Sequence, residues 1–545
     1  MRSSKQRITR RSFLAAPAAL AVSGTAMARP ANAYEAALLD QIDNLDVAKA
    51  AILSARHCSR YGFCVSPWLP RPIEVDLLAN DPILLRDVAM RAADIIARGA
   101  FDAKFFSKLT LVTLPKRTHG ALRLWAIAEP QDTVAYLTLA VLAAPVIEAH
   151  RIPTSSEVAH SWRFSPGRYQ LFDERYTLAS FHAASRRRAG STAFLVICDL
   201  VNCYGNLSAD QVAAAVGQSG VPGWQAEYLR QLLGFWQTPE SPGLPVASNA
   251  SRILAEAVLL QIDNRLRGAG IEFVRYADDF RLFAEDESAA RRTLEAVADA
   301  AAPHGLALNP DKTQIVRLGE TTTEPDLQVI DNEKLCVASD SENLPHNFRR
   351  ASVAEIRMLR SAHNKPNAQA LLQSKAAPPV SALRRAMRQA IYAGHDDFLY
   401  AVPAILRRYP EAAGVYSFAL RQASEFVSVG VRDHLRIELS AMLLDPMTPD
   451  FVTIKLIEIL SNPAYRDREA LERFARARAG APRGMTFRAA LDGLRETGGA
   501  MPDLAALFDE MDGWAKRALL ADPAFRRSIT FSPATPDLIA AKLAT

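Results

Sequence analysis

Apolar residues recur at intervals of three and four through the first hundred positions, as in 36–42 and 84–96. This spacing places them on one face of a helix, so the region from 34 to 100 is predicted to be helical. Gly62 and the prolines between 67 and 72 interrupt the pattern and predict a break between helices.

From position 111 onward, short apolar runs alternate with helical patterns, which predicts a unit of mixed α/β order. The run at 193–199 is continuously apolar and ends in one carboxylate, Asp199, as expected of a buried strand whose end leaves the core. Ser208 and Gln211 form a capping box that begins a helix. The other elements predicted here are a hairpin of 111–114 and 122–127, helices at 132–147, 249–267 and 289–302, and strands at 271–276, 280–284 and 306–316.

Beyond position 345 the strand patterns stop, and helical patterns follow one another to the end of the sequence. Pro, Gly, Asn or Asp residues separate them, as expected at helix ends. Pairs of such helices predict an α-solenoid or an irregular bundle, although no fixed period proves a repeat. The predicted helices are 351–361, 380–393, 396–408, 412–427, 431–443, 450–461, 466–477 and 503–520.

The chain of 545 residues is long enough for about two to four domains. Apolar residues make up 49% and charged residues 23%, an ordinary globular composition that excludes a disordered or fibrous protein. The net charge is +5, but six basic residues with no acid among them precede position 34, which leaves the remainder near −1. A nucleic-acid partner would therefore be held by local arginine clusters, unless these are solvated surface charges. The clusters are Arg186–Arg188, Arg349–Arg350, Arg384–Arg385 and Arg407–Arg408.

The five cysteines are odd in number and show no CxxC pairing. The sequence therefore indicates neither a zinc ribbon nor a disulfide framework, and reduced thiols are expected. The cysteines are Cys58, Cys64, Cys198, Cys203 and Cys336.

Three carboxylates lie where predicted strands end: Asp199 after the buried run, and Asp278 and Asp279 in the turn between 271–276 and 280–284. An Asp pair in a turn is common on its own, because Asp favours turn positions. The three side chains meet if the strand end and the hairpin are neighbours in one sheet. Mg²⁺ prefers hard oxygen ligands and keeps several waters, so one or two carboxylates per ion suffice. The pattern is therefore compatible with a Mg²⁺ site.

The residues around these acids resemble the motifs of reverse transcriptases. Tyr276-Ala277-Asp278-Asp279 resembles motif C, and Asp199 followed five positions on by Tyr204 resembles motif A. The resemblance implies nucleotidyl transfer to a 3′-hydroxyl by two Mg²⁺ ions, with Mn²⁺ as an alternative. The other matches are Gly243-Leu244-Pro245 with Ser251-Arg252 for motif B, Gly305 to Asn309 with Lys312 for motif D, and Pro115-Lys116, Gly120 and Arg123 for the fingers hairpin.

The fold that the resemblance implies is an α/β palm-and-fingers polymerase with an antiparallel palm sheet, followed by an all-α helical-repeat-like domain. The expected divisions are an N-terminal segment at 1–33, a helical N-terminal and fingers region at 34–110, fingers and palm at 111–330, and the α-helical C-terminal domain at 331–545.

The resemblance also implies roles for single residues. Asp199 and Asp278 are the expected metal bridges, Asp279 is a supporting ligand, and Leu200 beside Asp199 is included among the metal and nucleotide contacts. Lys312 is expected near the leaving pyrophosphate, where an ammonium donates a proton or offsets charge. The residues expected to bind the nucleotide are Lys116 and Arg123, which would grip the triphosphate, together with Leu200, Tyr204, Gly243 and Arg252.

Tyr204 bears on the choice of sugar. By resemblance its ring lies beneath the ribose and leaves no room for a 2′-hydroxyl, so the expected product is DNA. The expected partners are dNTPs and an RNA template or noncoding RNA, and the expected activity is that of an RNA-directed DNA polymerase. Alternatives are an RNA-synthesising polymerase, which Tyr204 disfavours, and a catalytically inactive nucleic-acid-binding scaffold.

The wording of motif B resembles that of the bacterial abortive-infection and defence-associated reverse transcriptases, which implies a role in antiphage defence. Some members of that group make DNA without a conventional template and start from a protein tyrosine. A template-independent or protein-primed polymerase therefore stays open, as does a homo-oligomer formed through the helical region. The tyrosines of that region are Tyr392, Tyr400, Tyr409 and Tyr416.

The first 33 residues resemble a twin-arginine export signal, with Arg10-Arg11 before a short apolar run and Ala26-Met27-Ala28 after it. That run is too short to span a membrane as a helix, and no membrane partner is expected. Export would separate the protein from deoxynucleotides, so we expect a cytoplasmic protein. On that interpretation the similarity is accidental or the start codon is set too far upstream.

Overall fold

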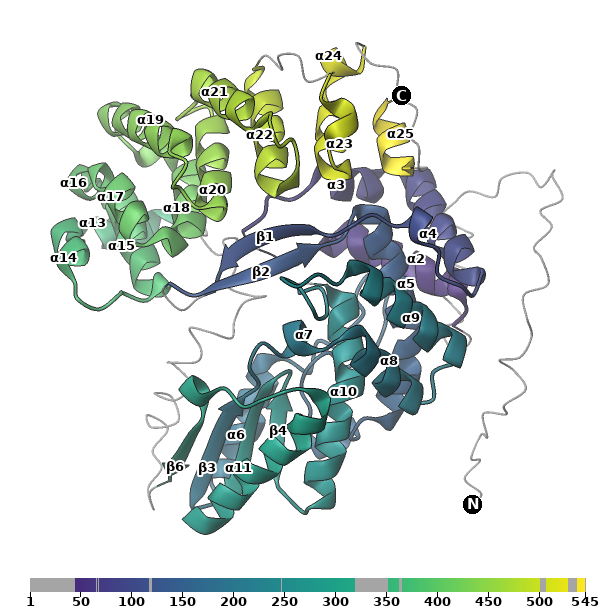
Figure 1. The fold of residues 1–545 in the computed structure, drawn as a ribbon. Helices are drawn as coiled ribbons and strands as arrows, with labels where there is room; N and C mark the ends of the chain where they lie inside the picture. The colour runs from purple at the N-terminus through teal and green to yellow at the C-terminus, as the bar shows by residue number, and fades with distance from the viewer. Residues whose placement is uncertain are drawn as a thin grey trace.

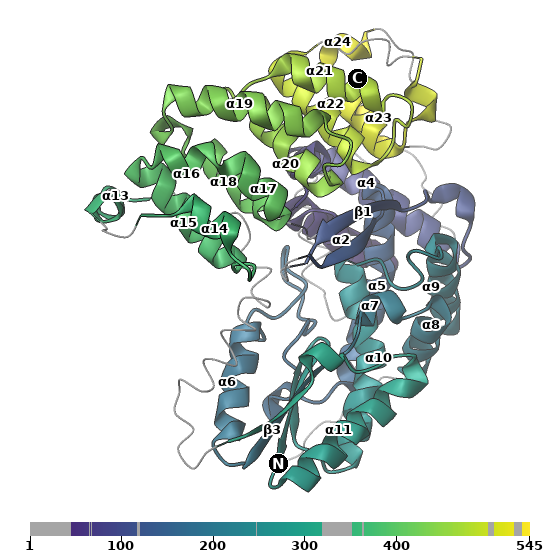
Figure 2. The ribbon, with the colours of Figure 1, turned by 60° about the vertical axis from the view of Figure 1, so that its left-hand side comes forward.

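The structure is a computed structural model that describes residues 45–64, 66, 68–116, 120–246, 248–318, 351–361, 365–499, 506–527 and 537–544. A unit built on a four-stranded sheet lies at one end of the molecule and an array of helices from the C-terminal part lies at the other (Figure 1). N-terminal helices and a two-stranded hairpin lie between them, as the turned view also shows (Figure 2). The twin-arginine-like segment, Arg349–Arg350 and Cys336 lie outside the described residues.

The four-stranded sheet is antiparallel throughout, in the order β4-β5-β3-β6. Its strands are β3 (Phe194–Asp199), β4 (Phe273–Tyr276), β5 (Asp279–Ala284) and β6 (Gln314–Arg317). The predicted strand at 306–316 is wrong in its first part, since only β6 is a strand. A turn interrupts the pattern, because Pro310 has no N–H to donate and the Asn309 side chain accepts from Asp311 N (3.2 Å).

Helices cover both faces of this sheet, which explains the uninterrupted apolar run of β3. Leu195 and Ile197 pack in the cluster of α6 (Leu178–Ala189), whereas Val196 and Cys198 belong to the main core. Alternate side chains of a strand point to opposite faces, so a strand buried on both faces needs apolar residues at every position. Besides α6, this unit contains α7 (Cys203–Asn206), α8 (Ala209–Gln218), α9 (Gly223–Trp236), α10 (Asn249–Gly268) and α11 (Glu287–Ala301), of which α11 packs on β3 and β5.

The N-terminal helices are α2 (Val47–Tyr61), α3 (Ile73–Asn80), α4 (Pro82–Ala97) and α5 (Pro130–His150), and the predicted break after Gly62 is confirmed. Among the described residues, α5 is the one helix that is long and apolar enough to cross a bilayer, by length and hydropathy alone. However, 67% of its most apolar window is buried within the protein, and α5 packs against α2, α4 and α10. We therefore interpret α5 as a core helix.

The predicted hairpin is confirmed as β1 (Thr110–Pro115) paired with β2 (Leu122–Ile127). Val112 and Leu114 are buried, whereas Leu111 and Leu122 on the opposite face are exposed. β1 packs against two C-terminal helices, α20 (Asp450–Ser461) and α22 (Gly484–Thr497). The C-terminal array therefore supports the hairpin.

The C-terminal region is helical, as predicted, but several boundaries differ. The helix expected at 396–408 is divided into α16 (Asp396–Tyr400) and α17 (Val402–Arg408), and the helix expected at 503–520 is only α23 (Gly513–Leu520) within the described residues. The sequence pattern missed α22 because it begins at Gly484 and contains Gly493, and glycine disfavours helices. The other helices of eight or more residues are α13 (Val353–Ser361), α15 (Val380–Ala393), α18 (Ala413–Gln422), α19 (Val429–Leu444) and α21 (Arg468–Arg478).

A buried ion network joins the C-terminal array to the N-terminal helices. Arg488 of α22 donates to both carboxylate oxygens of Glu74 in α3, at 2.8 and 3.0 Å. Arg517 of α23 also donates to Glu74 (2.8 Å) and forms an ion pair with Glu129, directly before α5. These side chains are almost fully buried, and each bonded arginine and glutamate are more than 380 positions apart in the sequence. The network fixes the C-terminal array to the helices that carry the hairpin.

Candidate active site

The structure brings the three predicted carboxylates together. β3 and β5 pair in a register that places Asp199 opposite Asp279, and the Leu200 N–H donates to the Asp278 carbonyl at 3.2 Å. Directly opposite residues of an antiparallel pair lie about 5 Å apart at Cα. The condition for a shared site, that the strand end and the hairpin are neighbours in one sheet, is therefore met.

The electrostatics of this site favour a cation. Loss of hydration at the Asp278 carboxyl, together with the negative charges of Asp199 and Asp279, raises the pKa of Asp278 to about 7. Among the described residues no group of three or more His, Cys, Asp or Glu side chains has a ready-made metal-binding geometry. The carboxylates nevertheless fit Mg²⁺ by donor type and by the negative charge that three of them bring to one place. Asp199, Asp278 and Asp279 would hold the ions.

Asp199 is held by two residues of the 305–312 segment. The Lys312 ammonium lies 2.8 Å from Asp199 Oδ2, and the Asn309 side-chain amide donates to the same oxygen at 3.1 Å. The backbone N–H of Asn309 donates to the Asp199 carbonyl at 2.7 Å. Burial lowers the pKa of Lys312, but the hydrogen bond to Asp199 and the charges of Asp199, Asp279 and Asp278 together outweigh burial, and the pKa is raised. Lys312 therefore stays charged beside the carboxylates.

Lys116 and Arg123 lie on the hairpin near this group of charges. Partial burial and the positive charges of Arg123 and Lys312 lower the pKa of Lys116, whereas Asp199 and Asp278 act in the opposite direction. Arg123 also acts on Asp278, where its charge lowers the pKa. The hairpin cations and the carboxylates therefore share one electrostatic environment.

Tyr204 lies close to the carboxylates, in the short helix α7. Burial of the phenol and the Asp278 charge raise its pKa, so the ring is neutral. The Leu244 N–H donates to the Tyr204 carbonyl at 2.8 Å. A Cβ at Gly243 would lie 2.3 Å from the Gly205 carbonyl oxygen, which no side chain tolerates. The close contact that requires glycine at 243 is thus with the protein's own backbone.

Arg252 projects from the first turn of α10. Its guanidinium lies over the Trp162 ring, 3.9 Å from the centroid, and donates to Asn249 Oδ1 at 2.8 Å. The Asn249 amide in turn contacts His57 Nε2 at 2.5 Å. Burial lowers the pKa of His57 to about 4, so this imidazole is neutral at pH 7. Stacking and a hydrogen bond fix the direction of Arg252.

Residues 143–359 match the protein family described as "Reverse transcriptase (RNA-dependent DNA polymerase)". This segment is a reverse transcriptase domain. The match confirms the expected enzyme class, an RNA-directed DNA polymerase and therefore a nucleotidyltransferase. It also confirms the expected fold class, since the domain contains the antiparallel sheet and is followed by a helical region. Lys116 and Arg123 precede the matched segment.

Two telomerases are among the solved structures with some similarity. Telomerase from Candida albicans, in complex with the TWJ fragment of telomeric RNA, is 12% identical over 72% of this chain and 68% of its own, with a TM-score of 0.28. Apo telomerase from Candida tropicalis is 11% identical over 85% of this chain and 74% of its own, with a TM-score of 0.29. A search of curated proteins finds no match.

The structure places four further residues beside the predicted ones, of which the sequence named only Asn309, as part of motif D, and of which His57 precedes the matched segment. Trp162, Asn249 and His57 hold Arg252, and Asn309 holds Asp199. Only Asn309 carried a local signal, because Asn before Pro favours a turn. The contacts of Trp162 and His57 join positions 90 or more apart, and no pattern along the chain reveals such contacts.

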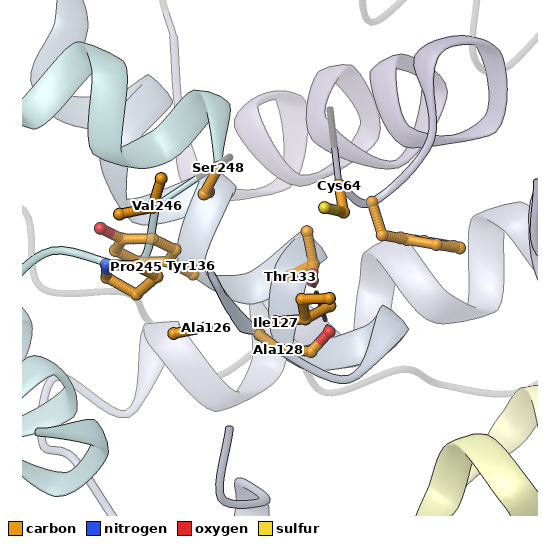
Figure 3. A pocket seen from close by; sticks show the side chains of 10 residues that line it. Cys64, Ala126, Ile127, Ala128, Thr133, Tyr136, Pro245, Val246 and Ser248 are labelled. Carbon is orange, nitrogen blue, oxygen red and sulfur yellow. Dashed lines mark hydrogen bonds between the residues drawn. The ribbon is translucent and has the colours of Figure 1, made fainter. Parts of the chain in front are cut away.

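A small pocket lies between the end of β2 and the loop before α10 (Figure 3). Its lining is mainly apolar and includes Ala126, Tyr136 and Pro245. The Tyr136 hydroxyl contacts Ser251 Oγ (3.0 Å), which donates to the Pro245 carbonyl at 2.7 Å. None of the three carboxylates lines it. We therefore interpret this pocket as a packing gap behind the loop.

The arginine clusters are partly used within the protein. Arg187 pairs with Glu157 (2.5 Å), and Arg188 donates to the Phe273 carbonyl. Arg408 donates to the Ser374 carbonyl at 2.7 Å. These contacts favour a structural role for these three arginines.

Proposed function

We propose that the chain extends a DNA 3′-hydroxyl with dNTPs on an RNA template, with Asp199, Asp278 and Asp279 as ligands for two Mg²⁺ ions. The observation that carries this proposal is the register of β3 and β5, which brings together three carboxylates that repel one another and of which only Asp199 is paired with Lys312. Such a site gains most from divalent cations, since they neutralise the charge that the carboxylates share.

In this proposal the protein's own groups bind and orient the substrate. Lys116 and Arg123 bind the triphosphate by charge-assisted hydrogen bonds, and Lys312 donates a proton to the leaving pyrophosphate or offsets its charge. The Tyr204 ring excludes a 2′-hydroxyl, and Arg252, held by Trp162, contacts the nucleotide. Leu200 acts through its backbone, which follows Asp199 directly and donates its N–H to the Asp278 carbonyl. When bound, the two metal ions activate the attacking hydroxyl and stabilise the leaving phosphates.

The direct test is incorporation of labelled nucleotides by the purified full-length chain, with Mg²⁺ and with its copurifying RNA or an added RNA template and DNA primer. We expect dNTP incorporation that Asp278→Asn abolishes. Asp210→Asn is the matched control, because Asp210 is exposed on α8 and pairs only loosely with Arg230, at 3.6 Å. Absence of incorporation by the folded native protein would refute the proposal, leaving an inactive nucleic-acid-binding scaffold.

We further propose that the polymerase acts in cytoplasmic antiphage defence. The residues of motif B and the helical array after the sheet unit support this proposal. The test is plaque formation on cells that carry the wild-type gene or its Asp278→Asn variant, with fractionation to locate the protein. Equal plaquing on both strains, or an exported protein, would contradict it.

A protein-primed, template-independent activity is a second candidate, supported by the exposure of one tyrosine. Tyr400 is 43% exposed, whereas Tyr392, Tyr409 and Tyr416 are at most 1% exposed. Only Tyr400 among these four presents its ring to solvent. Covalent labelling of the protein by a radioactive dNTP, lost in Tyr400→Phe and kept in Tyr61→Phe, would support this activity. Unlabelled wild-type protein would exclude it.

A further inference from the structure

The turn that carries Asp278 has an unusual backbone conformation. Ala277 has a φ of +51° and is buried, although it is not glycine. The left-handed region is disfavoured for residues with a Cβ, so a non-glycine residue persists there only where its surroundings hold it. Ala277 lies directly before Asp278, so its conformation sets the direction of the Asp278 side chain.

Arg275 contacts this turn from within the protein. It is fully buried, and its Nη1 donates to the Ala277 carbonyl at 3.0 Å. The same guanidinium donates to Asp263 at 2.8 and 2.6 Å and to Glu256 at 2.9 and 3.3 Å. These bonds use all five N–H donors of an arginine. No other side chain offers that number of donors in a fixed plane.

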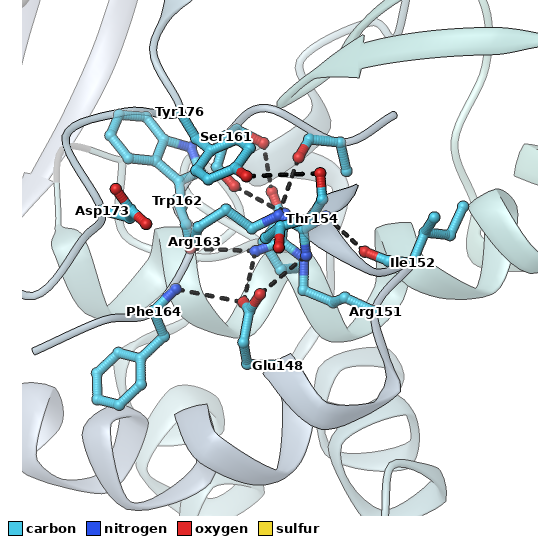
Figure 4. A network of polar contacts seen from close by, with 12 residues as sticks. Glu148, Arg151, Ile152, Thr154, Ser161, Trp162, Arg163, Phe164, Asp173 and Tyr176 are labelled. Atoms are coloured by element: carbon cyan, nitrogen blue, oxygen red, sulfur yellow. Dashed lines mark hydrogen bonds and ion pairs between the residues drawn. The ribbon is translucent and has the colours of Figure 1, made fainter. Parts of the chain in front are cut away.

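The two acids belong to α10, and one of them continues the network. Glu256 also pairs with Arg151 (2.9 Å) and accepts from Ser161 (2.7 Å). Arg151 and Arg163 both pair with Glu148, as the close view shows (Figure 4). Three arginines and three acids therefore balance in charge on the buried side of the turn between β4 and β5. Arg275, Glu256 and Arg151 cross-link the network, because each of them has partners on at least two segments.

We propose that Arg275 is a positioning residue: its hydrogen bond to the Ala277 carbonyl holds the turn left-handed and thereby directs Asp278 toward Asp199. This inference rests on the proposed role of Asp278 as a metal ligand. The simpler alternative is that Arg275 only neutralises Glu256 and Asp263. The proposal predicts that loss of the hydrogen bond to the Ala277 carbonyl weakens metal binding. The alternative predicts that metal binding is unchanged as long as the charge is kept.

The test compares two conservative variants of the full-length chain. Arg275→Lys keeps the charge, but its three donors on one nitrogen cannot replace the five bonds that Arg275 forms to the two acids and the Ala277 carbonyl. Arg151→Lys disturbs the same network at Glu256 but does not touch the hairpin, so it is the matched control. The first readout is Mn²⁺ binding by the protein without nucleotide, followed by electron paramagnetic resonance of free Mn²⁺, with a thermal melt for folding.

We expect Arg275→Lys to weaken Mn²⁺ binding about tenfold, the equivalent of one hydrogen bond to a charged donor, and Arg151→Lys to leave it within about twofold. Adding Ala277→Gly should restore binding to Arg275→Lys, because glycine adopts a positive φ without strain. The same addition should not improve Arg151→Lys. In an active enzyme, kcat should follow Mn²⁺ affinity while the KM for dNTP changes little.

Three results would overturn the inference: equal Mn²⁺ affinity in Arg275→Lys and wild type, equal losses in Arg275→Lys and Arg151→Lys, or no rescue by glycine. Failure of Arg275→Lys and its glycine double variant to fold, with Arg151→Lys folded, would also overturn it, because the bonds of Arg275 would then be needed for folding itself and not for the direction of Asp278. Native protein that binds Mn²⁺ through Asp278 but incorporates no nucleotide would refute the proposed function alone.

Discussion

The Lys312 ammonium lies 2.8 Å from Oδ2 of Asp199, so a cation of the protein neutralises a carboxylate that is proposed to bind metal. An entering metal ion must compete with this ammonium. Lys312→Met should therefore tighten Mn²⁺ binding to the nucleotide-free protein several-fold. The same variant should lower kcat for dNTP incorporation by about 100-fold if the ammonium also acts on the leaving group.

The control for this variant is Lys104→Met, since Lys104 is an exposed lysine that pairs with Asp102 on the surface. It should change neither quantity. Weaker Mn²⁺ binding in Lys312→Met would show that the lysine supports the metal site and does not compete with the metal. An unchanged kcat would remove Lys312 from the chemistry.

Gly243 is predicted to be irreplaceable for a steric reason. Gly243→Ala would place Cβ 2.3 Å from the Gly205 carbonyl oxygen, in backbone that cannot move aside without shifting Tyr204. We expect dNTP incorporation to fall at least tenfold, with a loss of stability of about 1–3 kcal/mol, as for other overpacked sites. Steady-state kinetics and a denaturant titration measure the two effects.

Gly234→Ala is the matched control for the glycine variant. Gly234 lies in α9, and a Cβ there would meet nothing within 4 Å. This control should be neutral or more stable by about 0.5–1 kcal/mol, because alanine is the better helix former. Normal activity of Gly243→Ala would mean that the Tyr204 loop can move without consequence for catalysis.

The sequence was most informative where structure is local. The apolar run of β3, with its terminal Asp199, predicted a strand buried on both faces, and the Ser208–Gln211 capping box is present as predicted. The carboxylates were also found in advance, because motif spacing is a local property. Their meeting in one sheet depended on the pairing of β3 with β5, which places Asp199 opposite Asp279 and which the sequence left as a condition.

The sequence pattern did not predict the long-range contacts. Nothing along the chain indicates that Glu74 pairs with Arg488 over 414 positions, or that α22, with two glycines, would be a buried helix. Gly243 was expected to contact the nucleotide, yet its close neighbour is Gly205. Such relations depend on how elements pack, and burial can reverse the meaning of a residue type: a charged Arg488 is part of the core.

The ion network at Glu74 is predicted to hold the C-terminal array against the N-terminal helices. Arg488→Met removes one partner and leaves Glu74 with only Arg517, inside the protein. Loss of one member of a buried pair costs about 3–5 kcal/mol, so the melting temperature should fall markedly. Because β1 packs on α20 and α22, the KM for dNTP should rise as well.

Arg468→Met is the control for Arg488→Met, since Arg468 forms an exposed pair with Glu472 at 2.8 Å. Exposed pairs contribute about 0–1 kcal/mol, and this variant should melt near the wild-type temperature. A strongly destabilised Arg488→Met with an unchanged KM would separate the array from nucleotide binding. An unchanged melting temperature would contradict the network's role.

Asp132, at the start of α5, is predicted to make stability depend on pH. Burial and the nearby Glu129 charge raise its pKa to about 8, despite the hydrogen bond from the Ser107 N–H. The unfolded chain loses this proton near pH 4, so between about pH 4 and 8 the native state binds more protons. The contribution of Asp132 to the free energy of unfolding therefore falls as pH rises through that window, and is constant above it.

Asp132→Asn should remove that slope, and at pH 9 it should be more stable than the wild type by on the order of 3 kcal/mol. The measurement is urea unfolding from pH 5 to 9, compared with Asp94→Asn, an exposed control in α4. Parallel pH profiles of the Asp132→Asn and wild-type proteins would show that Asp132 stays ionised in the native state.

Tyr204 is predicted to discriminate against ribonucleotides by the bulk of its ring, since burial keeps the phenol neutral. Tyr204→Ala should therefore raise the ratio of kcat/KM for an NTP to that for the matching dNTP by about 100-fold or more, because a site that excludes an atom sterically loses its selectivity when space opens. Tyr204→Phe keeps the ring and should keep the wild-type ratio. If Tyr204→Phe instead admits ribonucleotides, the hydroxyl and not the ring is the discriminating group; if neither variant does, the choice of sugar is made elsewhere in the site.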